Sequence, residues 1–176
     1  MDSLKHFVMP LLGLYQGVHH YSFDLDKSFF AHFEQSPVEN ADLKIDLILD
    51  KQSDFISLDF NLQGTIETNC DRCLADIHLP VENQYLVLLK PGVENAEEEI
   101  EEDVVYIDPD TEKYDISPIV YEVACLSIPL TKIYDCASED PKPCNEAVLN
   151  RLEENSPETD SDETALGEAL KNIKIK

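Results

Sequence analysis

Alternation of apolar and polar residues is the strongest pattern in the first half of the chain. Every second residue from Leu43 to Leu49 is apolar, and the same period returns from Ile56 to Leu62. This period is typical of antiparallel strands with one buried and one solvated face. The same reasoning predicts strands over 19–25, over 77–89 and, more briefly, over 104–107.

Two residues that interrupt regular strand geometry lie among these segments. Gly64 indicates a turn or a bulge, with a further extended segment over 65–69 beyond it. Pro80 cannot donate a hydrogen bond to a neighbouring strand, so the strand that contains it is expected at a sheet edge or with a bulge there.

After residue 115 the apolar pattern becomes helical. The residues that share one face of this predicted helix are Ile116, Ile119, Val120 and Val123. Asp115 is its expected N-cap, and Pro129 is expected to end it.

Shorter helices are predicted elsewhere. Asp26 is expected to cap a short helix bearing Phe29 and Phe30, and further helices are predicted over 146–152 and 165–176. Strands first and helices later predict an α+β fold, in which helices pack on an antiparallel sheet of about five to six strands.

The composition is strongly acidic, with 37 Asp and Glu against 13 Lys and Arg and a formal net charge of −24. Residues 94–103 (ENAEEEIEED) and 153–163 (EENSPETDSDE) contain many acids and no base. Both lack the apolar residues needed to fold, so they are expected to be solvated loops or linkers, or an electrostatic arm for a basic partner. The predicted organisation is a domain over 1–150 with an acidic loop at 94–103, then an acidic linker and short C-terminal helix over 151–176.

The same charge argues against two classes of partner. Broad electrostatic binding to bare nucleic acid requires clustered Lys and Arg, and docking on an anionic membrane requires a basic surface. The apolar segment Phe7–Leu14 contains Pro10 and precedes no small-residue cleavage site, and no run approaches the ~20 residues of a membrane span. The protein is therefore expected to be cytoplasmic.

The cysteines are the clearest candidate site. Cys70 and Cys73 form a Cys-x-x-Cys knuckle between two predicted strands, a spacing that can present both sulfurs to one tetrahedral ion. If the helix after residue 115 packs back on the sheet, Cys136 and Cys144 can complete a closed, structural zinc site. Four reduced thiols without metal are the alternative, and a redox pair is disfavoured because that motif is expected at a helix start. Cys125 is expected to be a small core residue.

Other chemistry-bearing residues have simpler interpretations. His19 and His20 are consecutive in a strand and should point to opposite faces, and Asp108 and Asp110 flank Pro109 in a predicted turn. The sequence contains no nucleotide-binding glycine motif, no nucleophile elbow and no metalloprotease motif. We therefore expect no enzymatic activity.

Several short motifs follow one another in a particular order over residues 8–150. They are Gly17-Val18-His19, Phe29-Phe30, Leu58-Asp59-Phe60-Asn61-Leu62-Gln63-Gly64, Cys70-Asp71-Arg72-Cys73-Leu74, Asp115-Ile116-Ser117 and Leu126-Ser127-Ile128-Pro129-Leu130. This order resembles the YceD family, the large ribosomal RNA subunit accumulation proteins, in a form similar to those of Bacteroidetes. The cysteine motif together with the downstream Ser-Ile-Pro helix end is the most specific part.

The resemblance implies a ribosome-biogenesis factor that supports accumulation of large-subunit ribosomal RNA without catalysis. Cys70 and Cys73 match the family's cysteine motif directly, and Cys136 matches a downstream cysteine. Tyr134 stands about where many relatives have a histidine, so Cys144 is taken as the fourth zinc ligand on chemical grounds.

Three functional hypotheses remain open at this point. The charge favours a non-enzymatic factor that contacts a basic large-subunit ribosomal protein or the assembling ribosome, with ribosomal RNA engaged indirectly. Direct RNA binding would use a patch around Arg72, Lys90 and Lys132. The third hypothesis is an enzyme, either a thiol oxidoreductase at the Cys-x-x-Cys pair or a hydrolase whose catalytic residues the sequence does not reveal.

Overall fold

A computed structural model describes residues 3–92, 103–134 and 143–154 of the chain. Most of the predicted acidic loop (94–102) lies outside the described residues. So do the linker beyond residue 154 and the predicted helix over 165–176. The predicted domain boundary after residue 150 falls within helix α3 (Glu146–Glu154), and the division itself stays a prediction.

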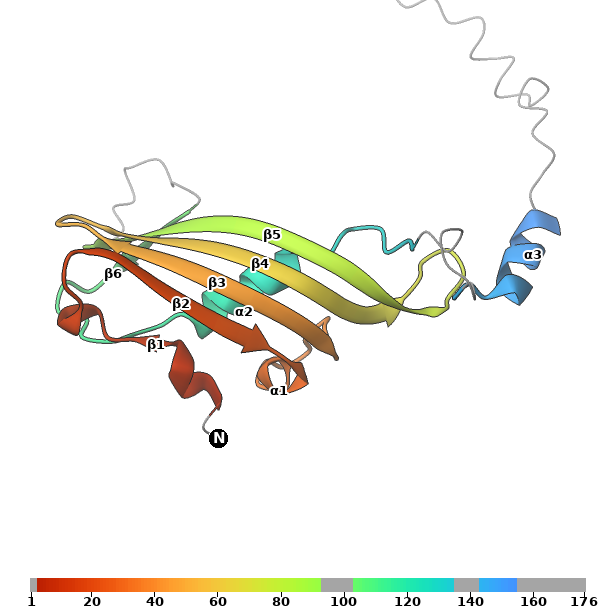
Figure 1. Cartoon of the computed structure of the whole chain (residues 1–176), viewed down its shortest axis with the longest axis horizontal. Helices are drawn as coiled ribbons and strands as arrows, with labels where there is room; N and C mark the ends of the chain where they lie inside the picture. Colours follow the sequence, from red (N-terminus) through yellow and green to blue (C-terminus); the bar gives the residue numbers. More distant parts are fainter. Residues whose placement is uncertain (1–2, 93–102, 135–142, 155–176) are drawn as a thin grey trace, which may run out of the picture.

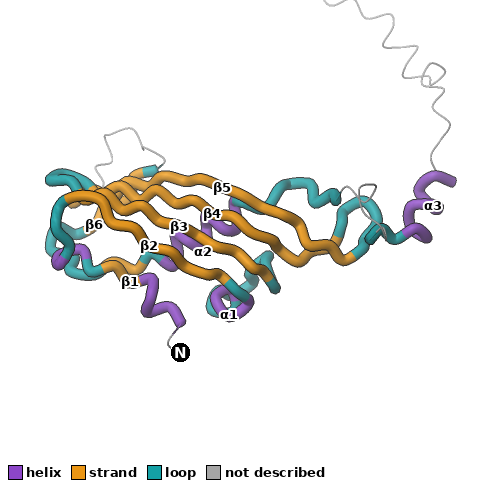
Figure 2. The backbone as a smooth tube through the Cα atoms, viewed as in Figure 1, coloured by secondary structure: helices purple, strands orange, loops and turns teal. Residues whose placement is uncertain are grey.

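A five-stranded sheet forms the body of the molecule (Figures 1 and 2). Its strands follow the chain in spatial order: β2 (Gly17–Leu25), β3 (Ala41–Lys51), β4 (Ile56–Asn69), β5 (Asp76–Pro91) and β6 (Val104–Ile107). The pairs from β2 to β5 are antiparallel, which confirms the α+β prediction.

The pairing of β6 adds one parallel pair to this predominantly antiparallel sheet. Leu88 to Pro91 of β5 pair with Val104 to Ile107 in parallel. A parallel pair needs a return connection of about a dozen residues, and the chain between Pro91 and Val104 has that length. Pro80 lies in the part of β5 that no described strand covers on its outer side, as expected for an edge position.

Gly64 does not form the expected turn or bulge. β4 runs through it without a change of register, and Gly64 pairs with Leu43 on one side and Val81 on the other. Its φ of +148° is open to glycine and strained for other residues. A Cβ atom there would overlap the Asp42 carbonyl oxygen and lie 2.8 Å from the Leu43 Cα, so glycine permits close approach of two strands rather than a turn.

Helices cover one face of the sheet. In Figure 1, α2 (Ser117–Leu126) runs behind β3 and β4, and α1 (Lys27–Phe30) lies at the end of β2. The N-terminal segment comprises η1 (Ser3–Phe7), β1 (Val8–Met9) and η2 (Leu11–Gly13), and β1 pairs with β7 (Tyr114–Asp115).

The helix caps agree with the sequence at α1 and differ at α2. The Asp26 carboxylate accepts hydrogen bonds from the backbone N–H groups of Ser28 (2.8 Å) and Phe29 (3.3 Å), as predicted. The N-cap of α2 is Ile116 instead of Asp115, because Asp115 is held in the short strand β7. Its carboxylate still accepts the Ser117 N–H at 2.9 Å.

The core lies between the sheet and these helices. The alternating apolar residues of β3 and β4 all point into it, together with Phe30, Ile116 and Val120. No helix among the described residues is long and apolar enough to cross a membrane. The opposite face of β2 to β5 bears the polar half of the alternation.

Candidate functional site

The Cys-x-x-Cys segment forms the tight turn between β4 and β5. The Leu74 N–H donates to the Cys70 carbonyl oxygen at 2.8 Å, and the Cys70 N–H donates to the Ala75 carbonyl oxygen at 2.8 Å. Leu74 adopts a positive φ of 58°, which lets the chain reverse within these few residues. The turn buries Cys70 and Cys73, each with 1% of its surface exposed.

A second segment of chain is fastened to this turn. The Asp71 N–H donates to the Lys132 carbonyl oxygen at 2.8 Å, and the Lys132 N–H donates to an Asp71 carboxylate oxygen at 2.7 Å. These reciprocal bonds hold the chain that follows α2 against the cysteine turn. We expected α2 to pack on the sheet and the chain after it to reach the cysteine turn. The structure shows this for the described residues, which here end at Tyr134.

The Cys70 sulfur lies among hydrogen-bond donors. Burial alone would raise the pKa of this thiol, because a thiolate loses hydration inside the protein. Hydrogen bonds from the backbone N–H groups of Tyr134, Cys73 and Arg72, and from the Cys73 thiol, outweigh burial and place the pKa of Cys70 below its ordinary value. The turn therefore stabilises a thiolate at Cys70, which is the form that binds metals.

The remaining predicted zinc ligands are placed only in part. Cys144 precedes α3, packs against the core and is disulfide-bonded in the structure. Cys136 lies outside the described residues. Among the residues that are described, no three His, Cys, Asp or Glu side chains gather as a metal site. The four-cysteine zinc site therefore stays a prediction.

Cys125 was expected in the core and lies at its margin. It is half-buried on α2, and burial is the main reason that its pKa is raised; the Tyr121 hydroxyl lowers it in part and the Glu122 carboxylate adds to the rise. This thiol is therefore protonated at neutral pH, unlike a metal ligand.

The predicted basic patch does not exist as one surface. Arg72 and Lys132 both belong to the cysteine turn and the segment bound to it. Lys90 lies at the other end of β5, fourteen residues from Asp76, which at about 3.3 Å per residue is roughly 45 Å away. Arg72 and Lys90 are only 18 residues apart in the sequence, but most of the long strand β5 lies between them and places them far apart in space.

The face of the sheet opposite the helices is a second candidate site that the sequence analysis did not single out. We call it the open face, and define it by the side chains of β2 to β5 that alternate with the core residues. Its central rows, read across the four strands, are His20, Ile48, Asp59 and Leu86; Ser22, Asp46, Asn61 and Gln84; and Asp24, Lys44, Gln63 and Glu82. The sequence did indicate this surface, because the mostly polar residues that alternate with the core residues of each strand must share one face of the sheet.

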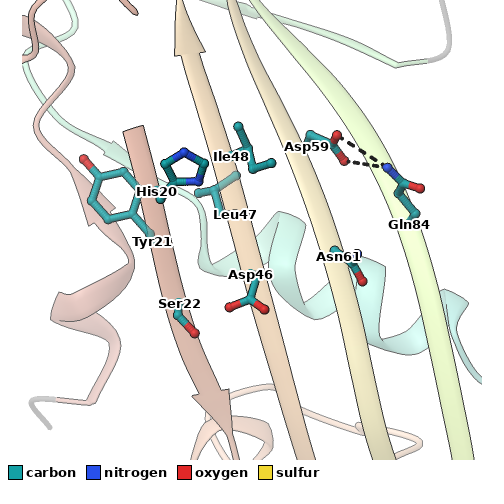
Figure 3. A pocket seen from close by; sticks show the side chains of 9 residues that line it. All are labelled: His20, Tyr21, Ser22, Asp46, Leu47, Ile48, Asp59, Asn61 and Gln84. Atoms are coloured by element: carbon teal, nitrogen blue, oxygen red, sulfur yellow. Dashed lines mark hydrogen bonds between the residues drawn. The ribbon is translucent and has the colours of Figure 1, made fainter. Parts of the chain in front are cut away.

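A shallow hollow of about 370 Å³ lies in the middle of the open face (Figure 3). Figure 3 shows His20, Ile48 and Asp59 side by side across three strands, with α2 on the far side of the sheet. The Gln84 amide donates to both carboxylate oxygens of Asp59, at 3.2 and 3.4 Å, and fixes its orientation. The lining of the hollow combines the His20 imidazole, the Asp46 and Asp59 carboxylates and the aliphatic side chain of Ile48.

Comparison with protein families gives one match. The family described as large ribosomal RNA subunit accumulation protein YceD matches residues 58–174, more than half of the chain. The matched region includes nearly all of β4, the cysteine turn, β5, β6, α2 and α3. Comparisons with curated proteins and with solved structures gave no match.

Proposed function

Because the chain belongs to the YceD family of large ribosomal RNA subunit accumulation proteins, we propose that it acts in large-subunit biogenesis as a non-enzymatic factor that binds a basic protein of the assembling ribosome. The family links the chain to large-subunit ribosomal RNA, and YceD is not a known enzyme family. A role with ribosomal subunits favours the cytoplasm as its location.

The observation that supports a protein partner over bare RNA is the charge. With 37 acids and 13 bases the chain attracts cations, and RNA phosphates are repelled by the same field. Large-subunit ribosomal proteins are the cationic components that such a factor meets.

A pulldown of the tagged full chain from extract at native salt tests this proposal. The recovered material is sorted into ribosomal proteins and ribosomal RNA, with and without nuclease treatment. We expect basic large-subunit proteins to remain bound after nuclease treatment. Recovery that depends wholly on RNA, with tight and salt-tolerant binding to a purified ribosomal RNA fragment, would overturn the proposal.

The second candidate function is direct RNA binding through the cysteine turn. Arg72 and Lys132 lie together there, and Lys90 does not contribute to that surface. Two cations would release only about two counterions on binding, so the binding constant would fall only gradually as the salt concentration rises. A steep salt dependence for a naked RNA fragment would favour a different RNA surface.

We further propose a structural zinc ion held by Cys70, Cys73, Cys136 and Cys144. Hydrogen bonds from N–H donors, one of them from Tyr134, lower the pKa of the Cys70 thiol against the effect of burial. Cys136 follows Tyr134 by two residues, a chain length that reaches at most about 7 Å. Cys144 would join the site only in its reduced form, because a ligating sulfur must be a free thiolate.

Elemental analysis of protein purified under reducing conditions without chelator tests the zinc proposal. We expect about one zinc per chain, lost in Cys70→Ser and in Cys73→Ser and retained in the matched control Cys125→Ser. Little zinc in the reduced protein, with an unchanged melting temperature after chelation, would contradict it. A thiol oxidoreductase would instead show turnover of a disulfide substrate that Cys70→Ser abolishes.

A further inference from the structure

None of the described segments covers the open face. Helix α2 packs on the other side of the sheet (Figure 1), and the side chains of the open face are mostly exposed or half-buried. Its carboxylates are Asp24, Asp42, Asp46, Asp50, Asp59, Glu67, Asp76 and Glu82. The lysines of the same strands on this face are Lys44, whose ammonium lies 3.5 Å from the Asp46 carboxylate, and Lys90 at the far end.

Two aliphatic side chains lie near the middle of this acidic surface, and Val18 and Leu88 lie on the same face nearer the strand ends. Ile48 and Leu86 are 41% and 49% exposed, and they flank Asp59 in one row across the sheet. Ile48 also lines the central hollow. An exposed apolar pair beside a hollow, surrounded by charge, has the arrangement of a binding surface with an apolar centre and a polar rim.

We propose that the open face of β2 to β5 is the surface that binds the basic partner, by receiving a lysine- and arginine-rich segment of a large-subunit ribosomal protein. This inference rests on the proposed function, and it specifies where the partner binds. Aliphatic side chains of the segment pack on Ile48 and Leu86, and its cationic groups pair with Asp46, Asp59 and Glu82.

The spacing of the carboxylates suits such a segment. Neighbouring strands are about 4.8 Å apart and alternate residues of one strand are about 6.7 Å apart, so Asp46, Asp59 and Glu82 lie within reach of successive long cationic side chains. Asp59 is held by Gln84 and does not need to be ordered on binding. An RNA strand on this face would place its phosphates against the same carboxylates.

Binding of the full chain to individually purified large-subunit ribosomal proteins, titrated at low salt, provides the test. The charge variant is Asp46→Asn, Asp59→Asn and Glu82→Gln together. Its matched control, Asp54→Asn, Glu112→Gln and Glu122→Gln, removes equal charge from exposed residues outside the open face. For the proteins that bind, we expect the dissociation constant to rise at least about tenfold in the open-face variant and less than about twofold in the control.

A second pair of variants tests the apolar centre without changing charge. Ile48→Ser with Leu86→Ser is compared with Leu126→Ser and Leu130→Ser, which alter exposed leucines at and beyond the end of α2. Only the first pair should weaken binding, and its effect should persist at high salt. Unchanged thermal melting of each variant shows that the fold is intact.

The outcomes separate this inference from the proposed function. If ribosomal proteins bind but the open-face variants behave like their controls, the location is wrong and the proposed function stands. If no purified large-subunit ribosomal protein binds the unaltered chain, the proposed function is overturned and this inference falls with it.

Discussion

Gly64 and Asp26 show how single residues determine local geometry in this fold. Gly64 is required where β3 and β4 approach closely, because a Cβ atom there would overlap the Asp42 carbonyl oxygen. Asp26 begins α1 by accepting the N–H groups that the first turn of a helix leaves unpaired.

Replacing Gly64 with alanine should destabilise the protein by more than about 1 kcal/mol, because strain at positive φ adds to overlap with the Asp42 carbonyl oxygen. Gly17 is the matched control, since its φ of +121° is also strained for alanine but the space around it is open. Urea unfolding of both variants gives the comparison. Equal losses in the two variants would show that the close approach of β3 and β4 is unimportant.

Replacing Asp26 with alanine should lower the free energy of unfolding by about 1 kcal/mol at neutral pH, whereas Asp26→Asn should keep most of the cap. Hydrogen bonds, the Ser28 hydroxyl first, hold the pKa of Asp26 below its ordinary value despite an opposing effect of burial. A carboxylate with a depressed pKa stabilises the fold above its unfolded pKa, near 3.8, and the benefit is lost as pH falls through the folded pKa. Melting curves should therefore show the gap between wild type and Asp26→Ala closing only in acid.

At the scale of elements, α2 connects the core to the candidate site. Its buried side chains pack on β4 and β5, and the chain that leaves it is bound to the cysteine turn through Asp71 and Lys132. Loss of packing under α2 should therefore disturb the cysteine turn as well as the core.

Val120→Ala should cost about 2 kcal/mol, because Val120 is fully buried and two carbon atoms of packing are lost. Leu126→Ala on the same helix is the control, since Leu126 is 64% exposed. Denaturant unfolding should separate the two clearly. A similar cost for both would mean that α2 is held mainly by its ends.

At the scale of the whole molecule, acidic residues lie on the open face and are also concentrated in the segments 94–103 and 153–163. The open face is ordered, so its carboxylates can make lasting contacts with a partner. The acidic segments add long-range attraction to a cation whatever their conformation.

Neutralising the acidic segment 94–103 should slow association with a basic ribosomal protein and leave dissociation nearly unchanged. The residues changed to glutamine are Glu97, Glu98, Glu99, Glu101 and Glu102. Association rates measured over a range of salt concentrations should converge with those of the unaltered chain as screening increases. A faster dissociation rate in this variant would mean that the segment is part of the bound contact.

The local patterns of the sequence predicted most of the elements. The alternation from Leu43 to Leu62 predicted two central strands, and Asp26 predicted the start of α1. Gly64 was misread because a glycine in a strand signals a bulge or a close approach equally well. The parallel pairing of β6 could not be predicted, since a short apolar run contains no information on strand direction.

The sequence by itself determined which residues of the alternating strands face the core and which family the chain resembles, because the first follows from periodicity and the second from ordered motifs. Tertiary structure alone decided which distant residues meet. It separated Lys90 from Arg72 along the length of β5, brought Tyr134 to the Cys70 sulfur, and aligned Ile48, Asp59 and Leu86 in one row. The physical reason is that these neighbours depend on strand register and chain reversal, which are set by cooperative packing of the whole sheet rather than by any local segment.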